Sequence, residues 1–147
     1  MSKPALFMNG APIVLGECIG RGGEGEVFLL RNAQGVAAKL YTVPDPGSRK
    51  DKIQAMIAGA LATSTNLVAF PASIISTSKG EFRGFTMRLV SGYKPLHELY
   101  APAARKINFG KADYRFLVRA ATNISRAVAS VHQSGCVIGD VNHSGIL

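Results

Sequence analysis

The sequence predicts an α+β fold, in which an antiparallel sheet comes first and a long helix follows. Segments with the pattern of β-strands recur through the first 90 residues and are separated by glycine-rich turns. Residues 112–133 then carry apolar side chains at helical spacing. Because the strands precede the long helix, the order argues against a repeating βαβ fold.

Five strands are expected before residue 91. The first runs into a glycine loop, and a turn at residues 32–35 joins the second to the third, since Gly35 can adopt a positive φ. Proline interrupts the fourth strand at position 71. The expected strands are residues 12–20, 26–31, 36–41, 67–76 and 82–90.

Three helices are expected. Ile53, Met56, Ile57 and Ala60 lie at i, i+3, i+4 and i+7, which predicts one face of a short helix. A second short helix is expected at residues 97–100, before Pro102, and a short strand-like piece at residues 137–138. The long helix, which Gly135 should end, has an apolar stripe of Phe116, Leu117, Ala120, Ile124, Ala127, Val128 and Val131.

Composition excludes several classes of protein. With 47% hydrophobic residues among 147, the chain is too apolar to be disordered. Its two cysteines lie far apart and its histidines number only three, so a zinc-ligand cluster is not expected. The amino terminus lacks the apolar run of a signal peptide, and no transmembrane segment is predicted. We therefore expect a cytoplasmic protein with no membrane partner.

The charge balance indicates an anionic partner. There are 17 lysines and arginines against 9 acidic residues, a formal net charge of +8. Such a balance suits a nucleotide, a nucleic acid or an acidic protein. A basic nucleic-acid-binding module is disfavoured, because no run of basic residues and no basic patch interleaved with aromatic residues is present.

Residues 20–27 have the pattern G-x-G-x-x-G-x-V. Glycines in a loop let backbone N–H groups approach phosphate oxygens closely, although a flexible glycine-rich hairpin has the same pattern. A dinucleotide-binding loop would run into a helix and be followed by an acidic residue about 20 positions later. Here the loop runs into a strand, and Lys39 lies near that position. The pattern therefore favours a phosphate-binding hairpin over a dinucleotide fold, and no Walker-type motif is present.

Two further motifs follow in order. Residues 36–39, Val-Ala-Ala-Lys, place Lys39 on the strand after the loop, where a cation would offset phosphate charge. A single lysine on a strand is otherwise usually a solvated residue. Residues 137–147 then contain Asp140, followed by two apolar residues at the end of the segment.

Taken together, these motifs resemble those of eukaryotic-like (Hanks-type) serine/threonine protein kinases. Residues 84–100, 104–106 and 138–142 resemble a bacterial subgroup that often carries a helix-hairpin-helix region after the kinase domain. The resemblance implies a kinase-like N-lobe, with a five-stranded antiparallel sheet and one helix, over residues 1–90. It implies a hinge and a partial C-lobe, through the catalytic loop, over residues 91–147.

The same resemblance implies an ATP site. Asp140 corresponds to the catalytic base, and Lys39 contacts the phosphates. Apolar positions in this site compete with ordinary core packing. Gly20, Gly22 and Gly25 would cover the phosphates, Val27 and Ala37 would line the adenine pocket, Met87 would be the gatekeeper, and Arg88 to Val90 would supply hinge backbone hydrogen bonds.

Four departures from the family pattern bear on activity. Ile138 and Gly139 replace the histidine and arginine before the aspartate, and Gly145 replaces the asparagine that binds Mg²⁺. No glutamate lies between Lys39 and Asn66, so Asp51 and Gln54 are the nearest substitutes for the usual lysine partner. The chain also ends before any Asp-Phe-Gly segment.

These features predict a fragment or truncated form of an ATP-dependent serine/threonine kinase. Whether the chain alone is an enzyme stays open, and little activity is expected of it because protein ligands for Mg²⁺ are missing. The alternative is a catalytically dead pseudokinase that binds nucleotide and a protein partner. Truncation would leave the stripe of the long helix uncovered, which predicts self-association, a domain swap or a covering partner.

Overall fold

The computed structural model describes residues 4–43, 45–139, 141 and 145–147. The chain divides into two compact units, Met1–Val90 and Ser91–Leu147.

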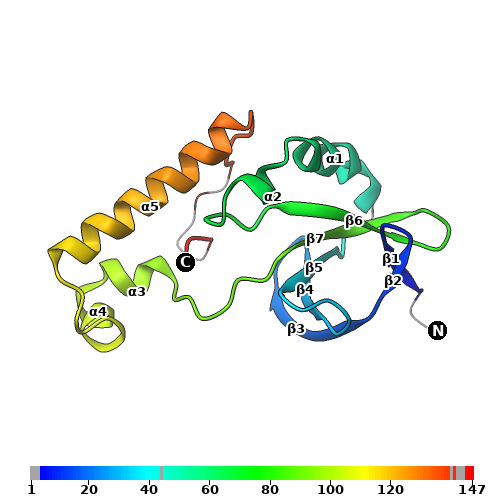
Figure 1. Ribbon diagram of the computed structural model, residues 1–147. Helices are drawn as coiled ribbons and strands as arrows, with labels where there is room; N and C mark the ends of the chain where they lie inside the picture. The colour runs from blue at the N-terminus through cyan, green and yellow to red at the C-terminus, as the bar shows by residue number, and fades with distance from the viewer. Residues whose placement is uncertain (1–3, 44, 140, 142–144) are drawn as a thin grey trace. The chain divides into compact units, whose positions relative to one another are not determined.

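The first unit is built on an antiparallel sheet of seven strands, which Figure 1 shows to be strongly curled. The strands follow the order β2-β1-β6-β7-β5-β4-β3, and every neighbouring pair is antiparallel. The α+β class is therefore confirmed, but the sheet has seven strands where five were expected. The strands are β1 (Leu6–Met8), β2 (Ala11–Ile13), β3 (Leu15–Arg21), β4 (Gly25–Leu30), β5 (Val36–Tyr41), β6 (Pro71–Thr77) and β7 (Phe82–Arg88).

The two additional strands form an amino-terminal hairpin. Its turn residues, Asn9 and Gly10, both have positive φ, 51° and 80°, as a tight hairpin turn with the twist of the sheet requires. The expected strand over residues 12–20 is in fact two strands, β2 and β3, with Val14 between them. Because β2 and β3 lie at opposite ends of the strand order, the sheet must curl until its two edges approach each other.

Side chains alternate between the two faces of this sheet. One face carries a core of Ile13, Leu30, Ala38 and Ile75, with Val36 and Leu40 packed against it. The opposite face carries a core of Tyr41, Phe82 and Phe85, which is completed by Ile53 from a helix. Residues 37, 39 and 41 of β5 therefore share the face that the helix covers.

The helix on that face is α1 (Lys50–Ala58), preceded by the 3₁₀ turn η1 (Pro46–Arg49) and followed by α2 (Leu61–Ser64). It confirms the helix expected from the spacing of Ile53 and Met56, although it begins earlier and ends before Gly59. The expected strand over residues 67–76 begins only at Pro71. Residues 67–70 are irregular, so the prediction was wrong for that part.

The second unit contains α3 (Leu96–Tyr100), α4 (Pro102–Asn108) and α5 (Tyr114–Gln133). The long helix is confirmed, and Asp113 caps it, with its side chain accepting a hydrogen bond from the Phe116 amide at 2.8 Å. Helix α4 was not expected from the sequence. Pro102 begins it, since proline is well suited to the first turn of a helix. Gly135 follows α5 with φ 78°. Residues 137–138 are not a strand, which corrects that expectation.

The apolar stripe of α5 is covered to different degrees along its length. Phe116, near the start, is 44% exposed, whereas Val131, near the end, is 5% exposed. The other five members of the stripe are half-buried. No helix among the described residues is both long and apolar enough to span a membrane.

Candidate functional site

The glycine loop is a tight hairpin between β3 and β4. Gly20 pairs with Val27 and Arg21 with Glu26, and the Gly22 amide donates to the Gly25 carbonyl at 2.9 Å. The Arg21 Nε also lies 3.2 Å from the Glu26 carboxylate. The loop therefore leads from strand to strand, a geometry that a dinucleotide-binding strand–loop–helix unit does not have.

The fold requires glycine at only one position of this loop motif. A Cβ at Gly25 would clash with the Leu40 carbonyl and lie 3.2 Å from the Tyr41 Cα. At Gly20 and Gly22 a Cβ would meet nothing closer than 3.7 Å, and at Gly23 nothing within 4 Å. None of these three has a positive φ. Neither backbone conformation nor packing explains why they lack side chains.

Lys39 lies on β5 between two strands. Its register partners are Val27 on β4 and Phe85 on β7. Directly opposed residues of antiparallel strands point to the same face, so these three side chains form a row across the sheet. Lys39 is half-buried, and its Nζ lies 5.6 Å from the centre of the Tyr41 ring.

A second row lies one step along the same strands. Ala37 is opposite Leu29 on β4 and Met87 on β7. Since residues 37 and 39 of one strand share a face, the two rows are adjacent. Ala37 is only 1% exposed, whereas Met87 is half-buried. The topology thus brings Val27, Ala37, Lys39 and Met87, predicted from sequence as one site, onto one face of the sheet.

Gly84 fixes how closely β7 approaches the lysine strand. It pairs with Leu40, and a Cβ there would clash with the Lys39 carbonyl. Its place in the sheet therefore demands glycine, so this residue positions the backbone on which Lys39 is carried.

Arg88 to Val90, the expected hinge, leave the sheet at the end of β7. Arg88 still pairs with Val36, and its guanidinium donates to the Asn66 carbonyl. The Leu89 amide donates to the Gly35 carbonyl at 2.8 Å. That amide already has an acceptor, so any ligand hydrogen bond from this segment would have to come from another backbone group.

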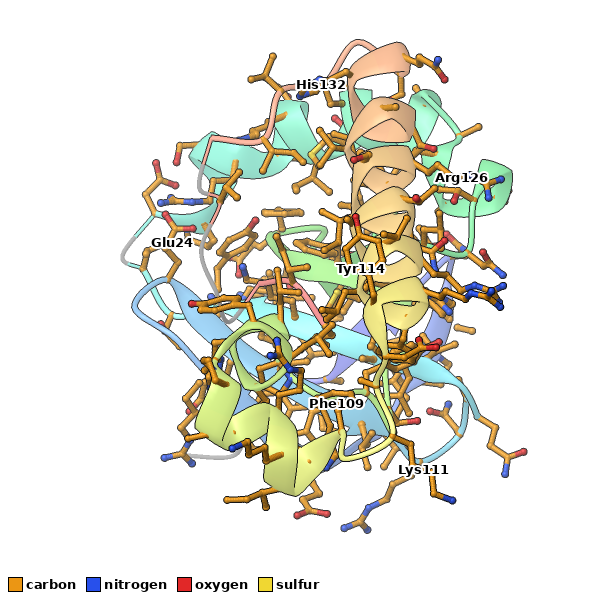
Figure 2. All side chains as sticks on the ribbon, turned by 90° about the vertical axis from the view of Figure 1, so that its left-hand side faces the viewer. Glu24, Phe109, Lys111, Tyr114, Arg126 and His132 are labelled. Carbon is orange, nitrogen blue, oxygen red and sulfur yellow. The ribbon has the colours of Figure 1, made fainter. Side chains whose placement is uncertain are left out.

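An ionic cluster that the sequence reading missed lies between the glycine loop and α1. Glu24, labelled in Figure 2, lies between the loop glycines, and its Oε1 accepts a hydrogen bond from the Arg49 Nη2 at 2.9 Å. The Thr42 amide donates to the Glu24 carbonyl at 3.0 Å. The Arg49 guanidinium lies 5.4 Å from the centre of the Tyr41 ring, the same ring that Lys39 approaches.

The charges of this cluster shift its pKa values. The hydrogen bond and charge of Arg49 lower the pKa of Glu24, with a smaller lowering from Lys39. Burial raises the pKa of Tyr41, which is 9% exposed. Glu24 therefore stays ionised at neutral pH and Tyr41 stays neutral. The only sequence signal for this cluster is an acidic residue between two loop glycines, which does not identify Arg49 as its partner.

The predicted catalytic aspartate, Asp140, lies outside the described residues, as do Asn142 and His143. Among the residues that are described, Ile138 is half-buried and Gly139 exposed. The described part of the candidate site therefore consists of the glycine loop, the two rows on the sheet and the ionic cluster.

This sheet, with a glycine hairpin between β3 and β4, a lysine on the adjacent β5 and one helix over the lysine face, has the fold of a protein-kinase-like N-lobe. Strands β3, β4, β5, β7 and β6 account for the five expected in that lobe, and the β1–β2 hairpin extends it.

The comparisons with known proteins agree with that class. The chain is 36% identical over 147 residues to protein kinase YegI of Escherichia coli O157:H7, a match that covers 99% of the chain and 23% of that protein. It is 37% identical over 140 residues to protein kinase YegI of Escherichia coli strain K12, covering 95% and 22%. The chain is thus similar to bacterial proteins named as protein kinases, and it spans less than a quarter of the length of these relatives. No family model matches the chain.

Proposed function

We propose that the first unit binds ATP, with the triphosphate under the glycine loop and Lys39 on the phosphates. The observation that carries the proposal is the contrast within the loop motif. Gly25 is required by the fold, whereas Gly20, Gly22 and Gly23 are not. Glycine is useful at such positions when a ligand must approach the backbone. The glycine loop runs directly into β4, where Val27 pairs with Lys39.

The two rows together support a base-binding surface. Val27 of the first row and Ala37 and Met87 of the second are apolar side chains on the same face of the sheet as Lys39. A planar, apolar base would lie against such a surface, and the lysine would then be near its phosphates. The same residues also pack the sheet, so their apolar character alone does not distinguish a base-binding surface from ordinary core packing. The loop glycines have no such second role.

In the whole protein we propose phosphoryl transfer from ATP to a serine or threonine of a protein substrate. Lys39 would orient the phosphates and offset their charge, and Asp140 would accept the proton of the substrate hydroxyl. Mg²⁺ would arrive with the nucleotide, since it binds mainly through phosphates with one or two carboxylates. Gly145 has no side chain with which to hold it.

The test is a thermal-shift titration of the chain with ATP, with and without magnesium. A ligand that binds only the folded state raises the melting temperature. We expect a rise for the unmodified chain, and no rise for Lys39→Met. Lys79→Met is the matched control, because Lys79 lies in the exposed turn between β6 and β7. A chain whose melting temperature ATP does not change would contradict the proposal.

A second candidate, a nucleotide-binding pseudokinase, is favoured by one specific observation. Helix α1 contains no glutamate, and its acidic residue is Asp51 in the first turn. The lysine–glutamate pair that activates kinases therefore has no counterpart on this helix. A phosphate-transfer assay on the chain with a generic protein substrate separates the two: turnover that Asp140→Asn abolishes supports the kinase, and ATP binding without turnover supports the pseudokinase.

A further inference from the structure

The ion pair between Glu24 and Arg49 joins the glycine loop to the turn that leads into α1. Arg49 is the last residue of η1, and its side chain is 31% exposed, against 60% for Glu24. Both ends are fixed by further contacts. The Glu24 carbonyl holds the Thr42 amide, and Arg49 lies against Tyr41, which packs on Phe82 and Phe85 at 5.9 and 6.2 Å between ring centres.

Arg49 and Lys39 approach the same aromatic ring, and Glu24 lies close enough to both for each to lower the pKa of its carboxyl group. The cluster thus contains two cations and one carboxylate. Lys52 also lowers the pKa of Glu24 and Asp45 raises that of Arg49, and when both are counted the balance is still positive. That charge lies beside the glycine loop. Gly20, Gly22 and Gly23 of this loop are not required by the fold, which is why a ligand is proposed to approach there.

A guanidinium binds two kinds of anion in the same forked geometry, carboxylates and phosphates. The Glu24 carboxylate therefore occupies on Arg49 a place that a phosphate group could take. The Glu24 side of the pair is mostly exposed to solvent, and ion pairs of exposed groups are weak, so a polyphosphate with several charges would displace the carboxylate from Arg49.

We propose that Arg49 is a second phosphate-binding residue, and that Glu24 is an internal anion which holds it until a polyphosphate displaces the carboxylate. The ligand class is the polyphosphate of a nucleotide, and in this respect the inference rests on the proposed function. Glu24 then opposes binding, although it lies within the loop that covers the phosphates.

The experiment measures the dissociation constants of ATP, inorganic tripolyphosphate and adenosine by calorimetry. We expect Glu24→Gln to bind ATP and tripolyphosphate about two- to fivefold more tightly, which is the competition expected of a solvated ion pair. We expect Arg49→Ala to bind both about fivefold or more weakly, with adenosine unchanged. Arg49→Gln provides a second variant in case the alanine chain does not fold.

Arg21→Ala is the matched control. Arg21 lies at the same hairpin, pairs with Glu26 and carries the same charge, but its side chain is 76% exposed and points to a different carboxylate. Its loss should change polyphosphate affinity less than the loss of Arg49. Equal effects of the two arginine substitutions would show that only overall charge matters, and would overturn the inference.

The outcomes separate the inference from the proposed function. ATP binding that depends on Lys39 but is unchanged in Arg49→Ala, or is weakened in Glu24→Gln, overturns the inference and leaves the function standing. Tripolyphosphate binding that depends on Arg49, in a chain that binds no ATP, supports the inference and overturns the function. A chain that binds neither ligand overturns both.

Discussion

At the scale of single residues, the loop glycines divide into those that the fold needs and those that it does not. Gly25→Ala should lower the free energy of unfolding by about 1–3 kcal/mol, because the new Cβ would be forced against the Leu40 carbonyl. Gly23→Ala should change it by less than about 0.5 kcal/mol, because the added Cβ meets open space. Urea unfolding of both variants measures the difference.

Gly23→Ala, which should hardly change the stability of the fold, should nevertheless weaken the binding of ATP. A Cβ at Gly23 would reduce access of phosphate to the loop backbone while leaving the fold intact. A Gly23→Ala chain that is stable and binds ATP as tightly as the unmodified chain would contradict the role proposed for these glycines.

The carboxyl of Glu24 provides a second prediction at this scale. Its folded pKa lies below the ordinary 4.5, because Arg49 favours the charged form. The stabilising contribution of a lowered carboxyl pKa is present above the unfolded value and is lost as the pH falls through the folded value. The pair should therefore be intact from neutral pH down to about 4.5.

Nuclear magnetic resonance of the Glu24 carboxyl carbon measures that titration. The midpoint should lie below 4.5 in the unmodified chain and return toward the ordinary value in Arg49→Ala. The Arg21→Ala chain supplies the comparison, since it keeps Arg49. An identical midpoint in all three chains would show that the ion pair does not form in solution.

At the scale of elements, α5 depends on its amino-terminal cap. Asp113 accepts the Phe116 amide, one of the unpaired donors at the helix start. Asp113→Ala should therefore destabilise the helix by about 1 kcal/mol, whereas Asp113→Asn should retain most of the cap. Thermal unfolding followed by far-ultraviolet circular dichroism compares the three chains, and equal stability of all three would contradict the role of the cap.

The sequence predicted some elements better than others for local reasons. Strand β5 was predicted with its observed bounds, because Gly35 and an apolar run delimit it. The β1–β2 hairpin was missed although Asn9–Gly10 is a strong hairpin signal, because a strand of three residues on either side offers little periodicity. Pro71 was treated as an interruption when it begins β6, where a proline is tolerated.

In the candidate site, too, some contacts could be expected from the sequence and others could not. Val27, Ala37, Lys39 and Met87 could be expected as neighbours only through the family resemblance, and the pairing of β5 with β4 and β7 places them on one face of the sheet. The Glu24–Arg49 pair could not, because its partners are 25 residues apart and one of them lies in an irregular turn. Long-range contacts of this kind follow from the path of the chain, which local patterns do not encode.

At the scale of the whole molecule, the formal net charge of +8 should govern how the chain meets a polyphosphate. Attraction between solvated charges weakens as salt shortens the screening length to about 8 Å at physiological ionic strength. ATP affinity should therefore fall steadily as sodium chloride rises, and more steeply for the unmodified chain than for Arg49→Ala, which still binds ATP but has one cation fewer at the site. Titrations at four salt concentrations measure both slopes, and a salt-independent affinity would contradict a phosphate-centred site.

Most of the exposed large apolar side chains of the described residues lie in the second unit. Ile107 is 83% exposed and Tyr114 is 79% exposed. Figure 2 shows Tyr114 at the start of α5, with Phe109 and Lys111 just before it in the chain. Within this unit Phe109 packs against Phe116 at 6.1 Å between ring centres, and Lys94 lies over the Phe109 ring. These contacts tie the segment that follows α4 to the first turn of α5.

The central claim is that the glycine hairpin and β5 of the first unit form a nucleotide-phosphate site. Amide chemical shifts of the unmodified chain, recorded as ATP and magnesium are added, test it most directly. The account predicts saturable shifts concentrated at residues 20–25 and 37–39, which are lost when Lys39 is replaced by methionine. Shifts that are absent at millimolar ATP, or that fall only in the β1–β2 hairpin and α5, would contradict it.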